Sequence, residues 1–180
     1  MKVEFLGSFK DKFPYPRYKE VVFCGRSNVG KSSLINFITG RNVARVSKTP
    51  GKTRLINYFL LEDKIYLVDV PGYGYASTSK AQQREWKRMM ENYFKKRKEN
   101  IDKVFLLIDG RIGFTELDNM MIDWLRYLSI PFVIVFTKVD KLTQSELAKL
   151  KNSIKSAGYK YVMTSVKEGV GKKELLSLLI

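Results

Sequence analysis

The sequence predicts a single α/β domain, built on a six-stranded, mostly parallel sheet with helices on both faces. Its length of 180 residues suits one domain and is short for two. From residue 20 onward, short apolar segments alternate with amphipathic segments, the order expected of βαβ units. Two of the apolar segments, Val104–Ile108 and Phe132–Phe136, contain no polar residue, which is typical of strands covered on both faces.

The first half of the chain predicts a strand, a helix and a hairpin. Glu20–Cys24 is a mostly apolar run that stops at a glycine, and Ser32–Thr39 has helical spacing up to the next glycine. Residues 41–53 are polar and basic and are expected to form a loop. Leu55–Leu61 and Lys64–Val70 are strand-like and are separated by two turn residues, so they predict an antiparallel pair.

Amphipathic helices and further strands fill the rest of the chain. Lys80–Lys98 and Glu116–Leu128 each predict a helix with one apolar stripe. These stripes are Trp86, Met89, Met90, Tyr93 and Phe94, then Leu117, Met120, Met121, Trp124 and Leu125. Beyond them, a helix is expected over Ser145–Ser156, a strand over Tyr159–Met163 and a last helix over Lys172–Ile180. Both tryptophans are expected to belong to the core.

The N-terminus predicts no separate domain and no targeting segment. Residues 1–19 are the least regular stretch and are expected to pack along the edge of a main domain formed by residues 20–180. They contain no uninterrupted apolar segment of the kind a secretory signal needs. The longest apolar runs are far shorter than the roughly 20 residues of a membrane span. We therefore expect a cytoplasmic protein that does not enter the membrane, and a monomer.

Composition excludes several kinds of chemistry. There is no histidine, so a Ser-His-Asp triad and the commonest metal ligand are absent. The one cysteine, Cys24, cannot form an internal disulfide and is expected to be a small buried apolar residue. The chain has 33 Lys and Arg against 18 Asp and Glu, a net charge of +15, which favours a polyanionic partner.

One motif points directly to phosphate binding. Residues 25–32 read Gly-Arg-Ser-Asn-Val-Gly-Lys-Ser, which fits G-x-x-x-x-G-K-[S/T] without a mismatch. The glycines let the backbone curl so that successive N–H groups face one anion, and the following helix adds its N-terminal N–H groups. Lys31 can reach the β- and γ-phosphates and Ser32 can bind Mg²⁺. The required context, a strand before and a helix after, is predicted here.

Three further segments follow predicted strands. Asp69-Val70-Pro71-Gly72 places a carboxylate for Mg²⁺ and a backbone amide for a γ-phosphate after one strand. Thr137-Lys138-Val139-Asp140 places a carboxylate that can accept from guanine N1–H and its 2-amino group, two donors that adenine lacks. Thr164-Ser165-Val166-Lys167 could offer backbone N–H groups to guanine O6. Each segment alone could be an ordinary loop. Because all of them occur in the expected order and each follows a predicted strand, chance does not explain the whole set.

These segments resemble the Ras-like, translation-factor class of GTPases, and are especially similar to the EngB (YihA/YsxC) family of bacterial ribosome-assembly GTPases. The resemblance rests on residues 25–36, 49–57, 67–76 and 137–142, and covers about residues 5–180. The run Pro-Gly-Tyr-Gly-Tyr-Ala at 71–76 is its most specific part. The resemblance implies a Ras-like P-loop GTPase domain, hydrolysis of GTP with Mg²⁺, a role in assembly of the large ribosomal subunit, and a link to growth, cell division and septation.

The family's functional residues can be carried over position by position. Lys31, Thr53, Gly72 and Asn28 would take part in catalysis, with Ser32 and Thr53 on Mg²⁺ and Asp69 supporting the ion through water. The nucleotide-binding residues would be Gly25, Arg26, Ser27, Asn28, Val29, Gly30, Lys31, Ser32, Ser33, Gly51, Lys52, Thr53, Arg54, Leu55, Asp69, Val70, Pro71, Gly72, Thr137, Lys138, Val139, Asp140, Thr164, Ser165 and Val166.

Departures from the family pattern are modest. Thr137 stands where Ras-like proteins generally have Asn, Val166 replaces the usual Ala, and Asp109-Gly110-Arg111 has a glycine in its middle. Tyr73 occupies the place of the glutamine that orients water in many Ras-like enzymes, so we expect slow intrinsic hydrolysis. Asn28 either stabilises a local turn or helps to hold K⁺ beside the phosphates; the second alternative predicts K⁺ stimulation.

Loss of the γ-phosphate is expected to release the loop at residues 41–53 and the segment after Asp69. One basic segment lies in the first of these, and another follows the second. Residues 41–54 carry five Lys and Arg with no acid, and residues 80–99 carry eight against three Glu. They could form a solvated face or bind rRNA of the large subunit under control of GTP. Two other functions stay open at this point: a metabolic P-loop kinase, for which residues 137–140 have no use, and a GTP-dependent RNA-binding module whose slow hydrolysis is only a timer.

Overall fold

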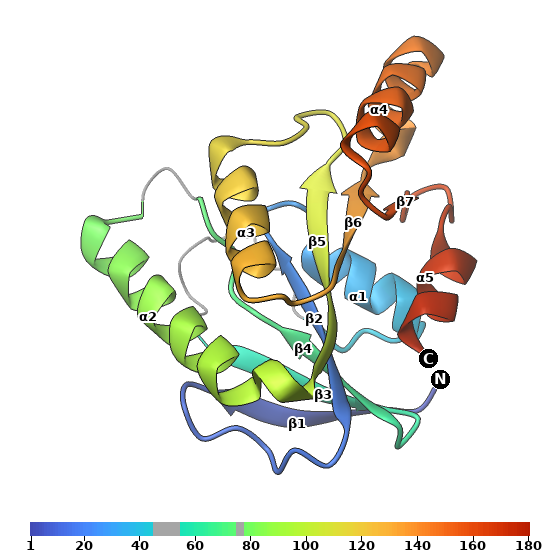
Figure 1. The fold of residues 1–180 in the computed structure, drawn as a ribbon. Helices are drawn as coiled ribbons and strands as arrows, with labels where there is room; N and C mark the ends of the chain where they lie inside the picture. Colours follow the sequence, from blue (N-terminus) through green and yellow to red (C-terminus); the bar gives the residue numbers. More distant parts are fainter. Residues whose placement is uncertain (45–54, 75–77) are drawn as a thin grey trace.

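Seven strands form one sheet in the computed structural model, which describes residues 1–44, 55–74 and 78–180 (Figure 1). The strand order across the sheet is β1-β3-β4-β2-β5-β6-β7. The strands are β1 (Val3–Phe9), β2 (Lys19–Gly25), β3 (Ile56–Leu61), β4 (Ile65–Asp69), β5 (Ile101–Asp109), β6 (Phe132–Thr137) and β7 (Tyr161–Met163). β3 pairs antiparallel with both β1 and β4, as the predicted hairpin requires, and the other neighbours are parallel.

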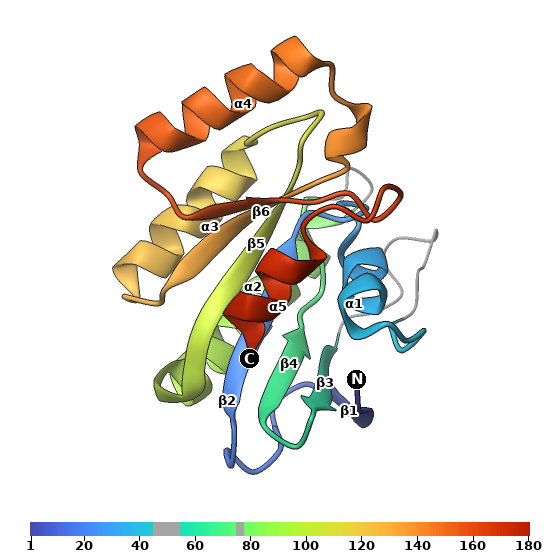
Figure 2. The same cartoon turned by 90° about the vertical axis from the view of Figure 1, so that its right-hand side faces the viewer.

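Five α-helices in the described part of the chain cover both faces of this sheet. They are α1 (Lys31–Thr39), α2 (Lys80–Arg97), α3 (Glu116–Tyr127), α4 (Gln144–Ala157) and α5 (Lys172–Leu179). Buried side chains of α2, α3 and α4 join one core cluster, and those of α1 and α5 join the other. Figure 2 shows α1 and α5 in front of the sheet. The predicted α/β class with helices on both faces is confirmed.

The central strand β2 shows why its residues form a buried strand. Val22 and Cys24 point into the cluster under α2 and α3, whereas Val21 and Phe23 point into the cluster under α1. All four are at most 1% exposed. Burial raises the pKa of the Cys24 thiol to about 12, so the cysteine behaves as the small apolar residue that the sequence predicted.

The number of strands differs from the prediction. Six strands were predicted, with residues 1–19 as the least regular stretch along the edge of the domain. Val3–Phe9 instead forms a seventh strand, β1, at the edge of the sheet and paired with β3. All residues of β1 are exposed or half-buried, and its register shifts between Phe5 and Gly7. An interrupted edge strand has no regular alternation of polar and apolar residues, so the sequence pattern did not predict β1.

Helix α3 is rotated relative to its predicted apolar stripe. Leu117 and Met120 were expected to face the core but are 42% and 58% exposed. Asp118 faces inward instead and is 1% exposed, while Met121, Ile122 and Leu125 form the buried side. The carboxylate compensates for its burial by accepting hydrogen bonds from the cap of its own helix and from Tyr73.

The end of α2 contains a buried ionic cluster. Glu20 is fully buried and accepts hydrogen bonds from Tyr58 and Tyr93, both at 2.7 Å. Its other oxygen lies 2.6 Å from Arg97 Nε and 2.5 Å from Arg97 Nη2, and Asn100 Nδ2 donates to it at 3.1 Å. Arg97 is therefore not part of the exposed basic segment that the sequence predicted over 80–99.

The carboxyl ends of β2, β4, β6 and β7 lead into the segments that the sequence singled out. In open α/β sheets, ligands bind at this edge, because strand ends and helix N-termini converge there. The fold therefore brings four segments that are far apart in the chain to one edge of the sheet.

Among the described residues, no helix is long and apolar enough to cross a bilayer.

Candidate nucleotide site

The phosphate loop connects β2 to α1. Gly30 precedes the helix with φ +101°, a left-handed conformation that favours glycine, and no side chain caps the helix. The first N–H groups of α1 are thus left for an anion, as the motif predicts. A Cβ atom at Gly25 would lie 3.0 Å from both the Leu107 carbonyl oxygen and Val29 Cγ1, so the start of the loop requires a residue without a side chain.

Lys31 and Asp69 lie together at the ends of the phosphate loop and β4. The Lys31 ammonium forms an ion pair with Asp69 Oδ1, and both side chains are largely buried. This contact joins the predicted phosphate-binding cation to the predicted Mg²⁺-supporting carboxylate. The two groups occupy neighbouring positions because Asp69 is paired in register with Phe23 of β2, two residues before Gly25.

The segment after Asp69 packs directly on the phosphate loop. Ser27 N–H donates to the Tyr73 carbonyl at 2.8 Å, and Tyr73 N–H donates to the Gly25 carbonyl at 3.2 Å. A Cβ atom at Gly72 would lie 2.9 Å from Ser27 N, so a larger residue would push the two segments apart. The close approach explains on steric grounds why this position holds glycine.

The Tyr73 side chain points away from the phosphate loop and into the protein. Its hydroxyl donates to Asp118 Oδ1 at 2.6 Å, and its ring packs against Trp86 at 5.7 Å between centroids. Burial raises the pKa of Tyr73 well above its ordinary value. The Trp86 indole N–H donates to the Pro71 carbonyl at 2.8 Å, so α2 and α3 both contact the segment after Asp69.

Asp118 was missed by the reasoning from sequence. Its role in the helix cap had a detectable signal, because Thr115-x-x-Asp118 is a capping box and Thr115 N–H donates to Asp118 Oδ2 at 2.8 Å. Its contact with Tyr73 had none, since it joins residues 45 positions apart.

The segment after β6 holds the phosphate loop from the other side. Thr137 Oγ1 donates to the Val29 carbonyl at 2.7 Å, and Lys138 Nζ donates to the Asn28 carbonyl at 3.0 Å. A threonine hydroxyl thus supplies a donor at the position where Ras-like proteins generally have asparagine. The segment and the phosphate loop are fixed relative to each other before any ligand is considered.

The predicted base-reading residues also lie together. Ser165 Oγ donates to Asp140 Oδ1 at 2.8 Å and accepts from the Glu168 N–H at 3.1 Å. Thr164 N–H donates to the Phe136 carbonyl at 2.8 Å, which anchors this segment to the end of β6. The hydrogen bond from Ser165 orients the carboxylate that the sequence predicted would read guanine.

Part of the predicted site lies outside the described residues. This applies to Gly51, Lys52, Thr53 and Arg54, including the expected Mg²⁺ ligand Thr53. Leu55 is described and lies directly before β3, where its side chain is 37% exposed.

The described donors suit a magnesium ion that arrives with a nucleotide. Within residues 1–44, 55–74 and 78–180, no cluster of three or more His, Cys, Asp or Glu could hold a metal. Mg²⁺ commonly takes one or two protein oxygens and completes its shell with substrate phosphates and water. The Ser32 hydroxyl and the Asp69 carboxylate are oxygen donors of this kind, so the residues fit the ion.

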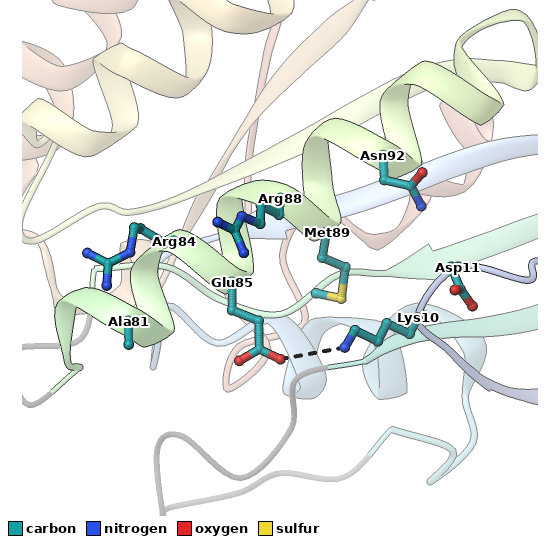
Figure 3. A pocket seen from close by; sticks show the side chains of 8 residues that line it. All are labelled: Lys10, Asp11, Ala81, Arg84, Glu85, Arg88, Met89 and Asn92. Atoms are coloured by element: carbon teal, nitrogen blue, oxygen red, sulfur yellow. Dashed lines mark ion pairs between the residues drawn. The ribbon is translucent and has the colours of Figure 1, made fainter.

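A separate groove of about 560 Å³ runs between α2 and the residues that follow β1 (Figure 3). It is lined by Lys10, Asp11, Ala81, Arg84, Glu85, Arg88, Met89 and Asn92. Lys10 and Glu85 point toward each other across the groove, with Nζ and Oε1 3.9 Å apart. None of its residues belongs to the predicted nucleotide site.

Comparison with known proteins gives a consistent result. A family model described as "50S ribosome-binding GTPase" matches residues 20–138. The chain is 57% identical to the "Probable GTP-binding protein EngB" of Aquifex aeolicus over the full length of both chains. It is 50% identical to the protein of that name from Thermotoga maritima, over 93% of this chain and 88% of the relative.

Solved structures agree with these sequence matches. A crystal structure titled as a probable GTP-binding protein engB matches with a TM-score of 0.69 and 28% identity, covering 89% of this chain and 96% of that chain. Era from Aquifex aeolicus, bound to GDP·AlF4⁻, also has a TM-score of 0.69, covering 89% of this chain and 55% of Era. At 23% identity, the likeness to Era shows the fold alone.

Proposed function

The chain belongs to the EngB family of GTP-binding proteins, and from this premise we propose that it hydrolyses GTP to GDP slowly and acts as a nucleotide-switched assembly factor for the large ribosomal subunit. Through that role it would be needed for growth and for normal cell division and septation. The observation that carries the nucleotide assignment is the convergence of four segments at one edge of the sheet, with Lys138 on the phosphate loop and Asp140 oriented by Ser165.

Guanine selection would come from Asp140. A carboxylate held by Ser165 can accept from the two guanine donors, whereas adenine would leave it unpaired. The kinase alternative is disfavoured because this arrangement gives a kinase no advantage. Titration with fluorescent GDP and ADP tests the assignment: we expect GDP to bind at least 100-fold more tightly, given the discrimination typical of unpaired buried polar groups. Equal affinities would contradict it.

Hydrolysis would depend on positioning of the phosphates rather than on a side-chain base. Lys31 and the free N–H groups at the start of α1 would hold the β- and γ-phosphates. Water would attack the γ-phosphorus as the bond from that phosphorus to the bridging oxygen breaks. Bound Mg²⁺ would neutralise charge on these phosphates, with Ser32, Asp69 and Thr53 as the proposed protein groups. Because the Tyr73 hydroxyl is bonded to Asp118, it is not directed at this water. This supports slow intrinsic turnover.

Potassium is the proposed source of the additional charge. Asn28 lies in the phosphate loop with φ +66°, and its carbonyl accepts from Lys138. We expect turnover to be faster in K⁺ than in Na⁺ buffer. Asn28→Gly retains a residue suited to positive φ and removes the amide, so it should abolish this difference. Equal rates in both buffers for the unmodified protein would contradict the proposal.

Contacts around Gly72 supply a route from nucleotide to surface. Gly72 packs on Ser27, and the neighbouring Pro71 carbonyl accepts from Trp86 of α2. A change at the γ-phosphate would therefore act on α2 and its exposed basic surface. That surface consists of Lys80, Arg84, Lys87, Arg88, Lys95 and Lys96 on the helix, and Lys98 directly after it.

The partner proposed for this surface is rRNA of the large subunit. Sedimentation with purified 50S subunits, with GDP or a non-hydrolysable GTP analogue, tests it at two salt concentrations. We expect co-sedimentation with the analogue only, weakening at higher salt. Arg84→Gln with Arg88→Gln should reduce the salt slope by about two units, one for each phosphate contact. The same change at Lys149 and Lys151, exposed on α4, is the matched control.

The alternative of a slow GTP-dependent RNA-binding module is favoured by one observation, the orientation of Tyr73. Gel shifts with rRNA in GTP, GDP and analogue, set beside the turnover rate with and without 50S subunits, separate the two. Acceleration of turnover by 50S subunits supports the assembly GTPase. RNA binding that depends on which nucleotide is bound, without a change in the GTP turnover rate, supports the GTP-dependent RNA-binding module.

A further inference from the structure

Asp109 lies at the end of β5, beside the segment that carries Lys138. It is paired in register with Thr137 and is 7% exposed. The next residue, Gly110, donates its N–H to the Thr137 carbonyl at 2.8 Å, and a Cβ atom there would lie 3.1 Å from that oxygen. The end of β5 is thus held closely against the residue that precedes Lys138.

The Asp109 carboxylate contacts two cations. Arg111 donates from Nη2 to Oδ2 at 2.9 Å, from Nε to Oδ1 at 3.2 Å and from its backbone N–H to Oδ1 at 2.9 Å. Lys138 Nζ lies 3.4 Å from Oδ2. Burial by itself would raise the pKa of Asp109, but the hydrogen bonds from Arg111 and the charges of Lys138 and Arg111 hold it below its ordinary value. The carboxylate is therefore ionised at neutral pH.

These contacts fix a side chain that would otherwise be mobile. Lys138 has φ +58°, and its Cε lies 3.6 Å from the position of a Cβ on Gly30, so its stem crosses the phosphate loop. The ammonium then lies between the Asn28 carbonyl and the Asp109 carboxylate. A lysine without such acceptors would lose its rotamer freedom when a ligand binds, and affinity would fall accordingly.

We propose that Asp109 is a positioning residue for guanine-nucleotide binding, which acts by holding Lys138 across the phosphate loop. The inference rests on the proposed function, because it concerns the same nucleotide site. Arg111 would keep the carboxylate in place, and it is the competing route by which Asp109 could act. A structural ion pair needs only Asp109 and Arg111, whereas positioning requires that the effect of Asp109 pass through Lys138.

Asp109→Asn tests this while retaining the turn. The Asn side-chain oxygen can still accept the Arg111 backbone N–H, so the local Asx turn is kept while the charge is lost. Asp102→Asn is the matched control, because it makes the same change at the opposite, exposed end of β5. We measure the affinity and the dissociation rate of two fluorescently labelled nucleotides, GDP and a non-hydrolysable GTP analogue. Both are measured with the full chain.

We expect Asp109→Asn to weaken both nucleotides by the same factor, about tenfold, mainly through faster dissociation, with kcat at saturating GTP unchanged. Asp102→Asn should change neither affinity by more than about twofold. In a Lys138→Met background, Asp109→Asn should have almost no further effect on affinity. Asp109→Ser, which also keeps an acceptor for the turn, should behave as Asp109→Asn does and replaces it if that variant does not fold.

Three results would overturn the inference. The first is unchanged nucleotide affinity in Asp109→Asn. The second is an equal loss of affinity with and without Lys138. The third is a loss that disappears in an Arg111→Ala background instead, which would make Arg111 the mediator. If the unmodified chain shows no preference for GDP over ADP, it is the proposed function that fails, and this outcome is separate from the other three.

Discussion

Replacing Tyr73 by Phe separates a structural role of this residue from a catalytic one. The change deletes a single hydroxyl, which donates to Asp118 Oδ1 at 2.6 Å, and leaves the ring on Trp86. Because Asp118 is 1% exposed, water cannot replace the lost donor. Hydrogen bonds to charged groups contribute about 1.5–3 kcal/mol.

The expected loss lies in the lower half of that range. The other Asp118 oxygen still accepts from Thr115 N–H at 2.8 Å and Thr115 Oγ1 at 2.9 Å, so the carboxylate is not left without partners. We therefore expect Tyr73→Phe to lower the free energy of unfolding by about 1.5–2 kcal/mol. For a chain of this length that corresponds to a Tm lower by about 3–8 °C.

Catalysis should hardly change, because the hydroxyl does not face the nucleotide edge. Urea unfolding gives the stability, and phosphate release at saturating GTP gives kcat, which we expect within about twofold of the parent. Tyr127→Phe is the control, since that side chain is 85% exposed and lies on the same helix as Asp118. A tenfold fall in kcat, or a stability loss no larger than that of the control, would refute the reasoning.

Three further predictions concern the core and the strand ends. Glu20→Gln should lower the free energy of unfolding in urea by about 3–5 kcal/mol, because it leaves the Arg97 charge buried and uncompensated. A loss as small as that caused by Glu99→Gln, at an exposed residue, would contradict this role of Glu20. Cys24 should react with a thiol reagent only after denaturation, because its pKa is about 12 and it is fully buried; rapid labelling of the native chain would argue against this packing. The pKa of Asp109 is lowered in the folded protein, so its stabilisation is complete above the unfolded-state pKa of about 3.9 and is lost as pH falls through the folded-state value. The stability difference between the parent and Asp109→Asn should therefore shrink as pH falls below about 4, and a difference independent of pH would contradict this.

Local spacing was enough to predict the loop between β2 and α1. The run from Gly25 to Ser32 places its glycines, lysine and serine by covalent connection alone, so a strand before it and a helix after it fix the loop. The hairpin at residues 55–70 and the apolar strands were equally accessible, because periodicity of side chains depends only on neighbouring residues. The class of the fold followed from the alternation of these elements.

Contacts between distant segments could not be predicted in this way. β1 is a strand only because β3 offers it an edge, and Arg97 is buried only because Glu20 lies opposite it. The inward turn of Asp118 likewise depends on Tyr73, a residue from another part of the chain. In each case the partner is a residue or strand that is distant in the sequence. The pattern of apolar residues therefore predicts the wrong orientation of the side chain, or predicts no element at all.

The sequence by itself determined which residue types stand at the carboxyl end of each strand, because that follows from order along the chain. Only the tertiary structure decided which of those ends touch. The strand order β1-β3-β4-β2-β5-β6-β7 places β5 directly beside β6, and so brings Asp109 to Lys138. Which strands pair depends on contacts between distant residues, on burial of both faces of the sheet and on right-handed crossover connections. No local sequence pattern specifies these pairings.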